Sequence, residues 1–260
     1  MDLSLTGKVA LVTGASKGLG RAIAESLAAE GMHVAMAART EPALREVAAG
    51  IESRGGQALV FPADLSIATA AQALVDAAVA RFGRIDLVVN NAGATKRGDF
   101  LQLTDHDWHD GYDLKFHGAV RLCRAAWPHL MHTRGSVVNI AGVGGRTGSA
   151  EFTLGGSVNA ALSLFTKALA DRGVQDHVRV NAINPGAIAT DRLTLRIAKL
   201  AAEEHVSDQE AATRLAARER VARFGIPREI GDAVAFLASD RAAYIHGAVI
   251  DIDGGLTRAL

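Results

Sequence analysis

The stretch KVALVTGASKGLGRAIAESLAAEG, from Lys8 to Gly31, decides how this chain folds. It begins with an apolar run typical of a buried strand, turns at glycines 14, 18 and 20, and ends as an amphipathic helix closed by Gly31. Glycines in such a turn let the backbone bend sharply and approach a pyrophosphate, whose charge the N-terminus of the next helix stabilises. The spacing differs from the common G-x-G-x-x-G pattern, so the turn alone is a weak signal for a nucleotide.

The same alternation of strand and helix continues along the rest of the chain. Ala-rich amphipathic segments separate the apolar runs HVAMAAR (33–39), QALVFPAD (57–64), IDLVVNNAG (85–93), GSVVNIAG (135–142), RVNAINPG (179–186) and GAVIDIDGG (247–255). Strands this apolar are buried on both faces, as in a parallel sheet. The sequence therefore predicts an α/β fold: a Rossmann-type doubly wound parallel sheet with helices on both faces, in a single domain over residues 1–260.

Charge and composition limit the kinds of partner that we expect for this chain. The chain has 28 Lys and Arg against 28 Asp and Glu, so no net charge attracts it to nucleic acid or to an anionic membrane. Its lone cysteine, Cys123, fits a reducing compartment, and no segment resembles a signal peptide or a membrane span. We expect a cytoplasmic protein with a small-molecule substrate. No metal is expected, because the spacing of His106 and His109 is ordinary for a solvated helix start.

One irregular region, residues 190–223, separates the end of a predicted strand from the last helix. In an open α/β sheet such an insertion overhangs the ligand crevice, so we expect one or two amphipathic helices that act as a substrate lid. Its arginines would suit an acidic substrate or would simply be solvated helix charges; they are Arg192, Arg196, Arg214, Arg218, Arg220 and Arg223.

Five motifs in order connect the chain to a known family: TGASKGLG (13–20), ADLS (63–66), NNAG (90–93), NPGAIAT (184–190) and DIDGG (251–255). Together they resemble the short-chain dehydrogenase/reductase family over essentially the full length. The resemblance implies a homotetramer, with Asp64 near the adenine and Thr190 near the nicotinamide amide. Cofactor-binding roles are implied for Gly14, Ser16, Gly18, Leu19, Asp64, Asn91 and Thr190, and the same motifs add Leu65, Ala92, Gly93, Pro185, Gly186 and Ile188.

Charge also predicts which cofactor is preferred. An acidic residue at the end of the second strand would bind the ribose hydroxyls of NAD and repel a 2′-phosphate. Ala38 and Arg39 stand there instead, and Lys17 adds a cation in the glycine turn. Two cations without a carboxylate favour NADP(H), with NAD(H) possible, because charge-assisted hydrogen bonds to phosphate are strong. The alternative is that Lys17 and Arg39 only face water.

The resemblance breaks down at the catalytic positions. The family uses a Tyr as proton donor, a Lys four residues later, a Ser thirteen residues earlier and an Asn from another helix. When VVNI (137–140) and EFTLGGSVNAALSLFTKALA (151–170) are laid on that pattern, Gly142 takes the place of the Ser, Gly155 of the Tyr and Asn159 of the Lys. In YDLKFHG (112–118), Lys115 takes the place of the Asn. Gly142 and Gly155 leave space in place of hydroxyl side chains, and Gly155 and Gly156 near a helix start suggest room or a close backbone approach.

Several chemical hypotheses follow. Asn and Lys have exchanged helices, so Lys115 and Asn159 could still face each other, and a desolvated Lys115 could act as acid and base. Lys115 could instead reach solvent or pair with Asp113 or Glu151. Tyr112, three residues before Lys115, is the phenol that could substitute for the missing Tyr, unless it only packs the helix.

The function expected from the sequence is an NADP-dependent oxidoreductase of short-chain dehydrogenase type, with a rewired active site and an unknown carbonyl/alcohol substrate pair. Two alternatives stay open. One is a non-catalytic NADP-binding sensor or regulatory protein. The other is non-redox chemistry, such as hydration or isomerisation with Lys115 as base.

Overall fold

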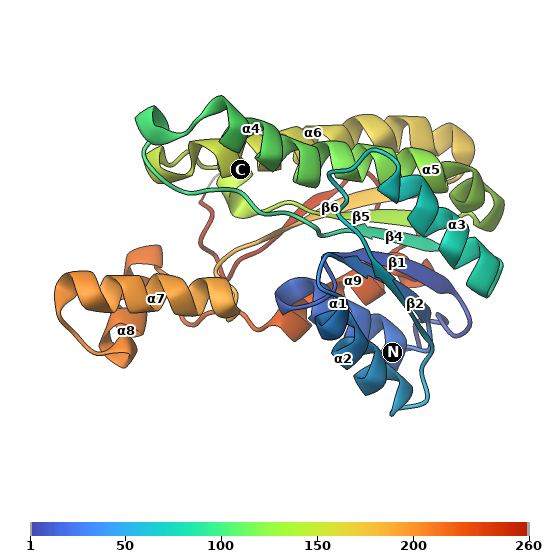
Figure 1. Ribbon diagram of the computed structural model, residues 1–260, viewed down its shortest axis with the longest axis horizontal. Coiled ribbons are helices and arrows are strands. Elements are labelled where there is room, and N and C mark those ends of the chain that lie inside the picture. Colours follow the sequence, from blue (N-terminus) through green and yellow to red (C-terminus); the bar gives the residue numbers. More distant parts are fainter. Residues whose placement is uncertain (1, 259–260) are drawn as a thin grey trace.

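A computed structural model describes residues 2–258 of the chain. Its centre is a seven-stranded parallel sheet in the order β3-β2-β1-β4-β5-β6-β7 (Figure 1). The predicted doubly wound sheet is therefore confirmed. The strands are β1 (Val9–Thr13), β2 (His33–Ala38), β3 (Ala58–Pro62), β4 (Leu87–Asn90), β5 (Ser136–Ile140), β6 (Arg179–Pro185) and β7 (Val249–Ile252).

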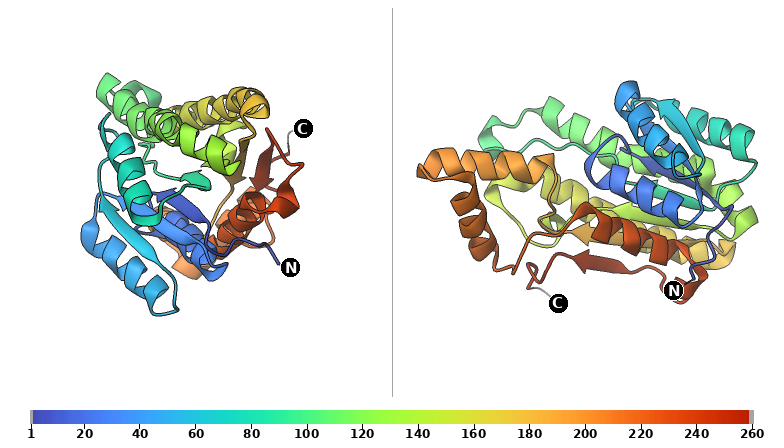
Figure 2. Two further views of the ribbon diagram at one scale, coloured as in Figure 1. Left: turned by 90° about the vertical axis from the view of Figure 1, so that its right-hand side faces the viewer. Right: turned by 90° about the horizontal axis from the view of Figure 1, so that it is seen from below.

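Helices cover both faces of the sheet, with α1, α2 and α9 on one side and α3, α5 and α6 on the other (Figure 1). An end-on view separates the three layers (Figure 2). The helices are α1 (Gly18–Ala29), α2 (Glu41–Glu52), α3 (Ala70–Phe82), α4 (Asp105–Tyr112), α5 (Gly118–Thr133), α6 (Thr153–Asp176), α7 (Asp191–Glu204), α8 (Asp208–Glu219) and α9 (Pro227–Ala238).

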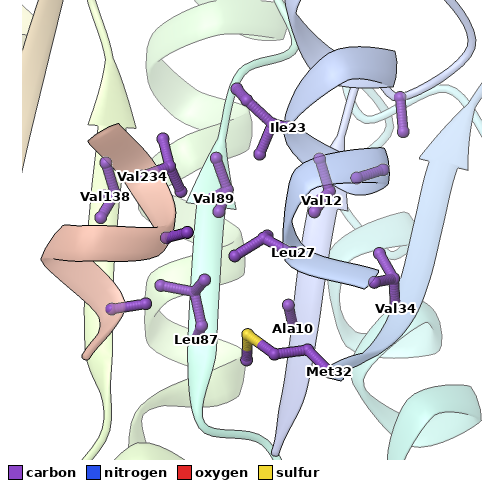
Figure 3. Packing of buried hydrophobic residues seen from close by; sticks show 14 of the residues in the cluster. Ala10, Val12, Ile23, Leu27, Met32, Val34, Leu87, Val89, Val138 and Val234 are labelled. Atoms are coloured by element: carbon purple, nitrogen blue, oxygen red, sulfur yellow. The ribbon is translucent and has the colours of Figure 1, made fainter. Parts of the chain in front are cut away.

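The apolar strands form two cores because alternate residues of a strand point to opposite faces. Val12, Val34 and Val89 pack beneath α1 and α9, as Figure 3 shows. Their neighbours Leu11 and Val88 face α3 and α5 instead. Both sets are fully buried, which explains why the strands read as continuous apolar runs rather than alternating ones.

Residues that the sequence marks as helix ends also form the observed helix caps. Gly31 and Gly83 adopt positive φ angles of 84° and 78° immediately after α1 and α3, as expected for left-handed C-terminal caps. Thr104 and Asp107 form a reciprocal capping box at the start of α4. None of the helices within residues 2–258 is long and apolar enough to cross a membrane.

The irregular region forms two helices, α7 and α8, which pack against each other beyond the carboxyl ends of the strands (Figures 1 and 2). Two polar contacts tie α7 to the body: Lys17 lies 4.0 Å from Asp191, and Arg192 donates a 2.5 Å hydrogen bond to the Gly93 carbonyl. A backbone bridge between Ile188 and Gly225 closes the base of the region. We call residues 190–223 the arm.

Candidate active site

The predicted site residues gather at the carboxyl ends of β1, β4, β5 and β6. The strand order reverses between β1 and β4, because the chain first builds outward through β2 and β3 and then returns. Crevices at such switch points are the usual ligand sites of open α/β sheets. A cavity of about 250 Å³ lies at the opposite end of the sheet, lined among others by Lys8, Asp86 and Arg179, and none of the predicted site residues borders it.

The glycine turn after β1 is shaped for close contact with a ligand. Gly14 and Gly18 have positive φ angles of 66° and 55°, and a Cβ on Gly20 would lie 2.2 Å from the Gly14 oxygen. Asn91 fixes the turn by donating its amide to the Thr13 oxygen at 2.9 Å. The N-terminus of α1 has no side-chain cap and no acidic residue in its first turn. Its backbone N–H groups are therefore available to an anion, and the turn fits a pyrophosphate.

Other predicted cofactor residues converge on this turn. A Cβ on Gly18 would lie 3.6 Å from the Thr190 methyl group, and Ala92 donates its N–H to the Thr13 hydroxyl at 2.9 Å. Gly186 lies against the backbone of Asp253, which joins the NPGAIAT and DIDGG motifs. Segments far apart in sequence thus line one crevice.

The carboxyl end of β3, where the family resemblance places the adenine, is polar. Asp64 accepts hydrogen bonds from the Ser66 amide at 2.9 Å and from its hydroxyl at 2.7 Å. These bonds, helped by the charge of Arg39, lower the pKa of Asp64. Arg39 is exposed and makes no ion pair within residues 2–258, whereas Lys17 lies near Asp191. Of the two cations predicted near the cofactor, Arg39 is therefore the one without a carboxylate partner in the described residues.

The Lys115 side chain extends from a break in the α-helical geometry between α4 and α5. Residues Asp113–His117 form a π-helical segment between α4 and α5, and the Gly118 N–H bonds to the Asp113 oxygen, five residues back. Such wide turns re-aim side chains and are frequent at functional sites. The Lys115 Nζ donates to the Ala141 oxygen at 2.7 Å and to Asn159 Oδ1 at 2.5 Å.

The Lys115 ammonium has no carboxylate partner in the described part of the chain. Asp113 instead bonds to His117 at 2.8 Å, and Glu151 makes no contact with the lysine, so the alternative pairings considered from the sequence are wrong. Burial, with a smaller contribution from the charge of Arg192, lowers the pKa of Lys115 to about 7. At neutral pH the group can both donate and accept a proton. The predicted contact between Lys115 and Asn159 is present.

Gly142 and Gly145 make room for the Asn159 side chain. A Cβ on Gly142 would lie 2.9 Å from Asn159 Nδ2, and a Cβ on Gly145 would lie 2.9 Å from the Asn159 Cβ. Gly142 also has a φ of 145°, which a larger residue would adopt only with strain. Its N–H is held at 3.0 Å by Asn184, which in turn bonds to Asp251.

Gly155 and Gly144 make room for Phe152. A Cβ on Gly155 would lie 2.1 Å from the Phe152 ring, and a Cβ on Gly144 would lie 2.9 Å from it. The expected open room at Gly155 is therefore wrong, because an aromatic ring of the same chain fills it. The expected close backbone approach is found at the next residue, where a Cβ on Gly156 would lie 2.8 Å from the Gly144 oxygen.

Tyr112 packs away from the lysine. Its ring lies 6.2 Å from Phe116 in an edge-on arrangement and 6.5 Å from His117. No hydrogen bond of its hydroxyl is found among residues 2–258. The π-helical segment begins directly after Tyr112 and changes the regular α-helical spacing from which a face shared with Lys115 was predicted. The described residues also contain no group of three His, Cys, Asp or Glu side chains that could hold a metal ion.

Comparison with known proteins supplies the family. A family model described as enoyl-(acyl carrier protein) reductase matches residues 14–257. A short-chain reductase protein, NovJ of Streptomyces niveus, is 37% identical over 95% of this chain and 93% of its own length. This chain belongs to the short-chain dehydrogenase/reductase family.

Two further family members agree with this assignment. The 3-oxoacyl-[acyl-carrier-protein] reductase FabG of Escherichia coli is 33% identical over 98% of this chain and 99% of its own length. The crystal structure of L-sorbose reductase from Gluconobacter frateurii, complexed with NADPH and L-sorbose, superposes with a TM-score of 0.96 at 31% identity, covering 100% of both chains. The short-chain dehydrogenase/reductase fold is thus present over the whole chain.

Sequence reasoning missed two residues of this short-chain dehydrogenase/reductase site. Phe152 fills the space above Gly155, and the Arg97 guanidinium stacks on the Phe152 ring, 4.1 Å from its centroid. A glycine three residues after an aromatic residue at a helix start was the one available signal for Phe152. Nothing in the sequence pointed to Arg97, which follows the NNAG motif in a loop.

Proposed function

We propose that this protein is an NADPH-dependent oxidoreductase that reduces a small carbonyl compound, with Lys115 as the proton donor. The observation that carries the proposal is the position of the Lys115 ammonium. It is held by the Ala141 oxygen and Asn159 Oδ1, without a counter-ion within residues 2–258, and it lines a small pocket together with Thr13 and Ala92.

The proposal includes a rewired catalytic centre. On the family pattern, Gly142, Gly155, Asn159 and Lys115 occupy the positions of the usual Ser, Tyr, Lys and Asn. On that pattern an ammonium and an amide have exchanged helices, and in this chain they are hydrogen-bonded to each other, so a titratable group still lies in the site. The phenol is replaced by a glycine covered by Phe152, which removes the usual donor and leaves Lys115 to perform its task.

The proposal also includes a cofactor site. Bound NADPH would supply the hydride. The backbone of the glycine turn would hold its pyrophosphate, Asn91 and Thr190 would lie beside the nicotinamide half, and Asp64 would lie at the adenine. Arg39 would bind the 2′-phosphate, which favours NADPH over NADH.

Lys115 would complete the reduction by protonating the carbonyl oxygen as hydride reaches the carbon, so that an alcohol and a neutral lysine result. Its stem packs on Gly93, where a Cβ would lie 2.8 Å from Lys115 Cδ, and this contact directs the amine. Asn159 and the Ala141 carbonyl keep the amine oriented between turnovers. A proton from solvent restores the ammonium.

Two further features belong to the proposal. The arm, residues 190–223, is the substrate lid, because its first helix already contacts the site through Arg192 and Gly93. The active protein is a homo-oligomer, by analogy with the family's usual tetramer.

Single-turnover kinetics test the function. Protein in excess of NADPH is mixed with panels of aldehydes and ketones, while the nicotinamide absorbance and the fluorescence of bound NADPH are recorded. Loss of absorbance with a carbonyl substrate supports the reductase. Tight NADPH binding with no loss of absorbance across the panel contradicts it in favour of a sensor, and conversion of substrate without a change in the nicotinamide favours non-redox chemistry.

A further inference from the structure

The arginines of the arm divide into two kinds. Four are neutralised by glutamates: Arg196 by Glu219, Arg214 by Glu204 and Glu210, Arg218 by Glu204, and Arg223 by Glu229. Arg192 and Arg220 have no carboxylate partner within residues 2–258, but Arg220 ends α8, whereas Arg192 donates to the Gly93 carbonyl. Most arm arginines are thus structural ion pairs, and Arg192 alone among the six is bonded to the site.

The location of Arg192 is electrostatically unfavourable for the empty protein. It lies in the first turn of α7, where the helix dipole favours an acidic side chain and disfavours a cation. Its charge also acts on Lys115 and lowers the pKa of that group, after the larger effect of burial. Helix stability alone therefore gives no reason for a cation at this position.

Arg97 is a second guanidinium near the site, because it stacks on Phe152, which packs against Gly144 beside Asn159. It stacks on Phe152 at 4.1 Å from the ring centroid, and Phe152 itself is seated on Gly155. Arg97 forms no ion pair within residues 2–258. Burial, then repulsion from Arg196, lowers its pKa, and Arg192 adds to this, whereas Glu151 and Glu219 act in the opposite direction. Glu219 is already bonded to Arg196, so Glu151 is left as the carboxylate that acts on Arg97, against the two guanidinium charges of Arg97 and Arg192.

Gly93 connects Arg192 with Lys115. The Gly93 carbonyl oxygen accepts a hydrogen bond from the Arg192 guanidinium. On its other side, a Cβ at Gly93 would lie 2.8 Å from Lys115 Cδ. The chain as a whole carries no net charge, so this concentration of cations is local. Cations that repel one another around an open crevice are stabilised when an anion enters.

We infer that the substrate carries an anionic group, most simply a carboxylate, which Arg97 and Arg192 bind while its carbonyl lies at Lys115. The planar guanidinium matches the geometry of a carboxylate or phosphate, and stacking on Phe152 holds one guanidinium in a fixed plane. This inference rests on the proposed function for the reacting group, whereas the anion site itself is independent of turnover.

The experiment compares acids with uncharged analogues of the same shape. Probes are α-, γ- and δ-keto acids, each paired with its carboxamide, in the NADPH oxidation assay. In parallel, calorimetry measures binding of benzoate and of benzamide to protein saturated with NADP. The variants are Arg97→Gln and Arg192→Gln, with Arg214→Gln as the matched control, because Arg214 is neutralised by two glutamates.

The inference predicts that acids are preferred over amides by at least about tenfold in affinity or in kcat/KM, and that the difference in kcat/KM comes from KM. Either site variant should remove most of this preference. Arg214→Gln should keep it. Equal handling of acids and amides, or a preference that survives both site variants, overturns the inference. A loss confined to NADPH affinity would assign Arg192 to the cofactor and also overturn it.

The two proposals fail separately. Benzoate binding that depends on Arg97 and Arg192 without any turnover would retain the anion site and reject the reductase. Turnover of amides as fast as acids would retain the reductase and reject the anion site.

Discussion

Two glycine-rich turns, each following a strand of the sheet, use the same residue for opposite purposes. After β1, Gly14, Gly18 and Gly20 bring backbone N–H groups to an uncapped helix end, where a ligand can reach them. After β5, Gly142 and Gly144 lie beneath side chains of the chain itself, Asn159 and Phe152. The first turn is open to a ligand, and the second is filled by the protein.

This contrast explains how the fold and the glycine turn can be kept in the rewired site that we propose. The turn after β1 depends on backbone geometry, which tolerates little variation because a Cβ at Gly20 would overlap the Gly14 oxygen. The turn after β5 depends on complementary side chains, so paired exchanges such as Lys115 with Asn159 are possible. We therefore expect substitutions in the second region to act in pairs.

Removing the amine should have the largest effect. Lys115→Met should lower the turnover rate by about a hundredfold or more, because general acid catalysis contributes on that scale. NADPH affinity should stay within about twofold, since the glycine turn is untouched. Stopped-flow absorbance gives the rate, and fluorescence titration gives the affinity. Lys167→Met, at an exposed position on α6, is the control and should keep full activity; a Lys115→Met variant as active as this control would refute the role.

Filling the second turn should destabilise the protein. Gly155→Ala should lower the free energy of unfolding by about 1 to 3 kcal/mol, because its Cβ would overlap the Phe152 ring. Phe152→Ala in the same chain should recover much of this loss, a non-additive result expected for touching residues. Urea denaturation measures both. At Gly148 a Cβ meets nothing within 4 Å, so Gly148→Ala is the control. Additive effects of the two substitutions at 152 and 155 would contradict the packing.

The role of the turn after β1 can be tested by measuring cofactor binding. Arg39→Asp should weaken NADPH binding relative to NADH by about tenfold, because a carboxylate repels the 2′-phosphate and favours the ribose hydroxyls. Parallel fluorescence titrations with the two cofactors measure the ratio. Arg45→Asp on the neighbouring helix α2, where Arg45 pairs with Glu41, controls for general charge effects. An unchanged ratio in Arg39→Asp would mean that the phosphate is bound elsewhere.

The sequence predicted the sheet and the first turn because their signals are local. Apolar runs reflect burial on both faces, and the glycine turn lies between a strand and a helix that are contiguous in the chain. The pairing of Lys115 with Asn159 was also predictable, because two changes at distant positions compensate each other. Phe152 and Arg97 were not predictable. For Phe152, the reason is that a sequence does not distinguish a glycine that leaves room for a ligand from one that leaves room for a neighbouring ring. The path of the loop that carries Arg97 depends on tertiary packing.

The pH dependence of carbonyl reduction is the most direct test of Lys115. The protonated amine is the donor, so kcat/KM for reduction should fall as the pH rises through about 7, where burial has lowered the pKa of Lys115. For alcohol oxidation the neutral amine is the acceptor, and the rate should rise through the same range. Asn159→Asp would place a carboxylate beside the ammonium and should move both transitions to higher pH. A reduction profile that stays level until about pH 10, where a phenol titrates, and that ignores Asn159→Asp would contradict the account.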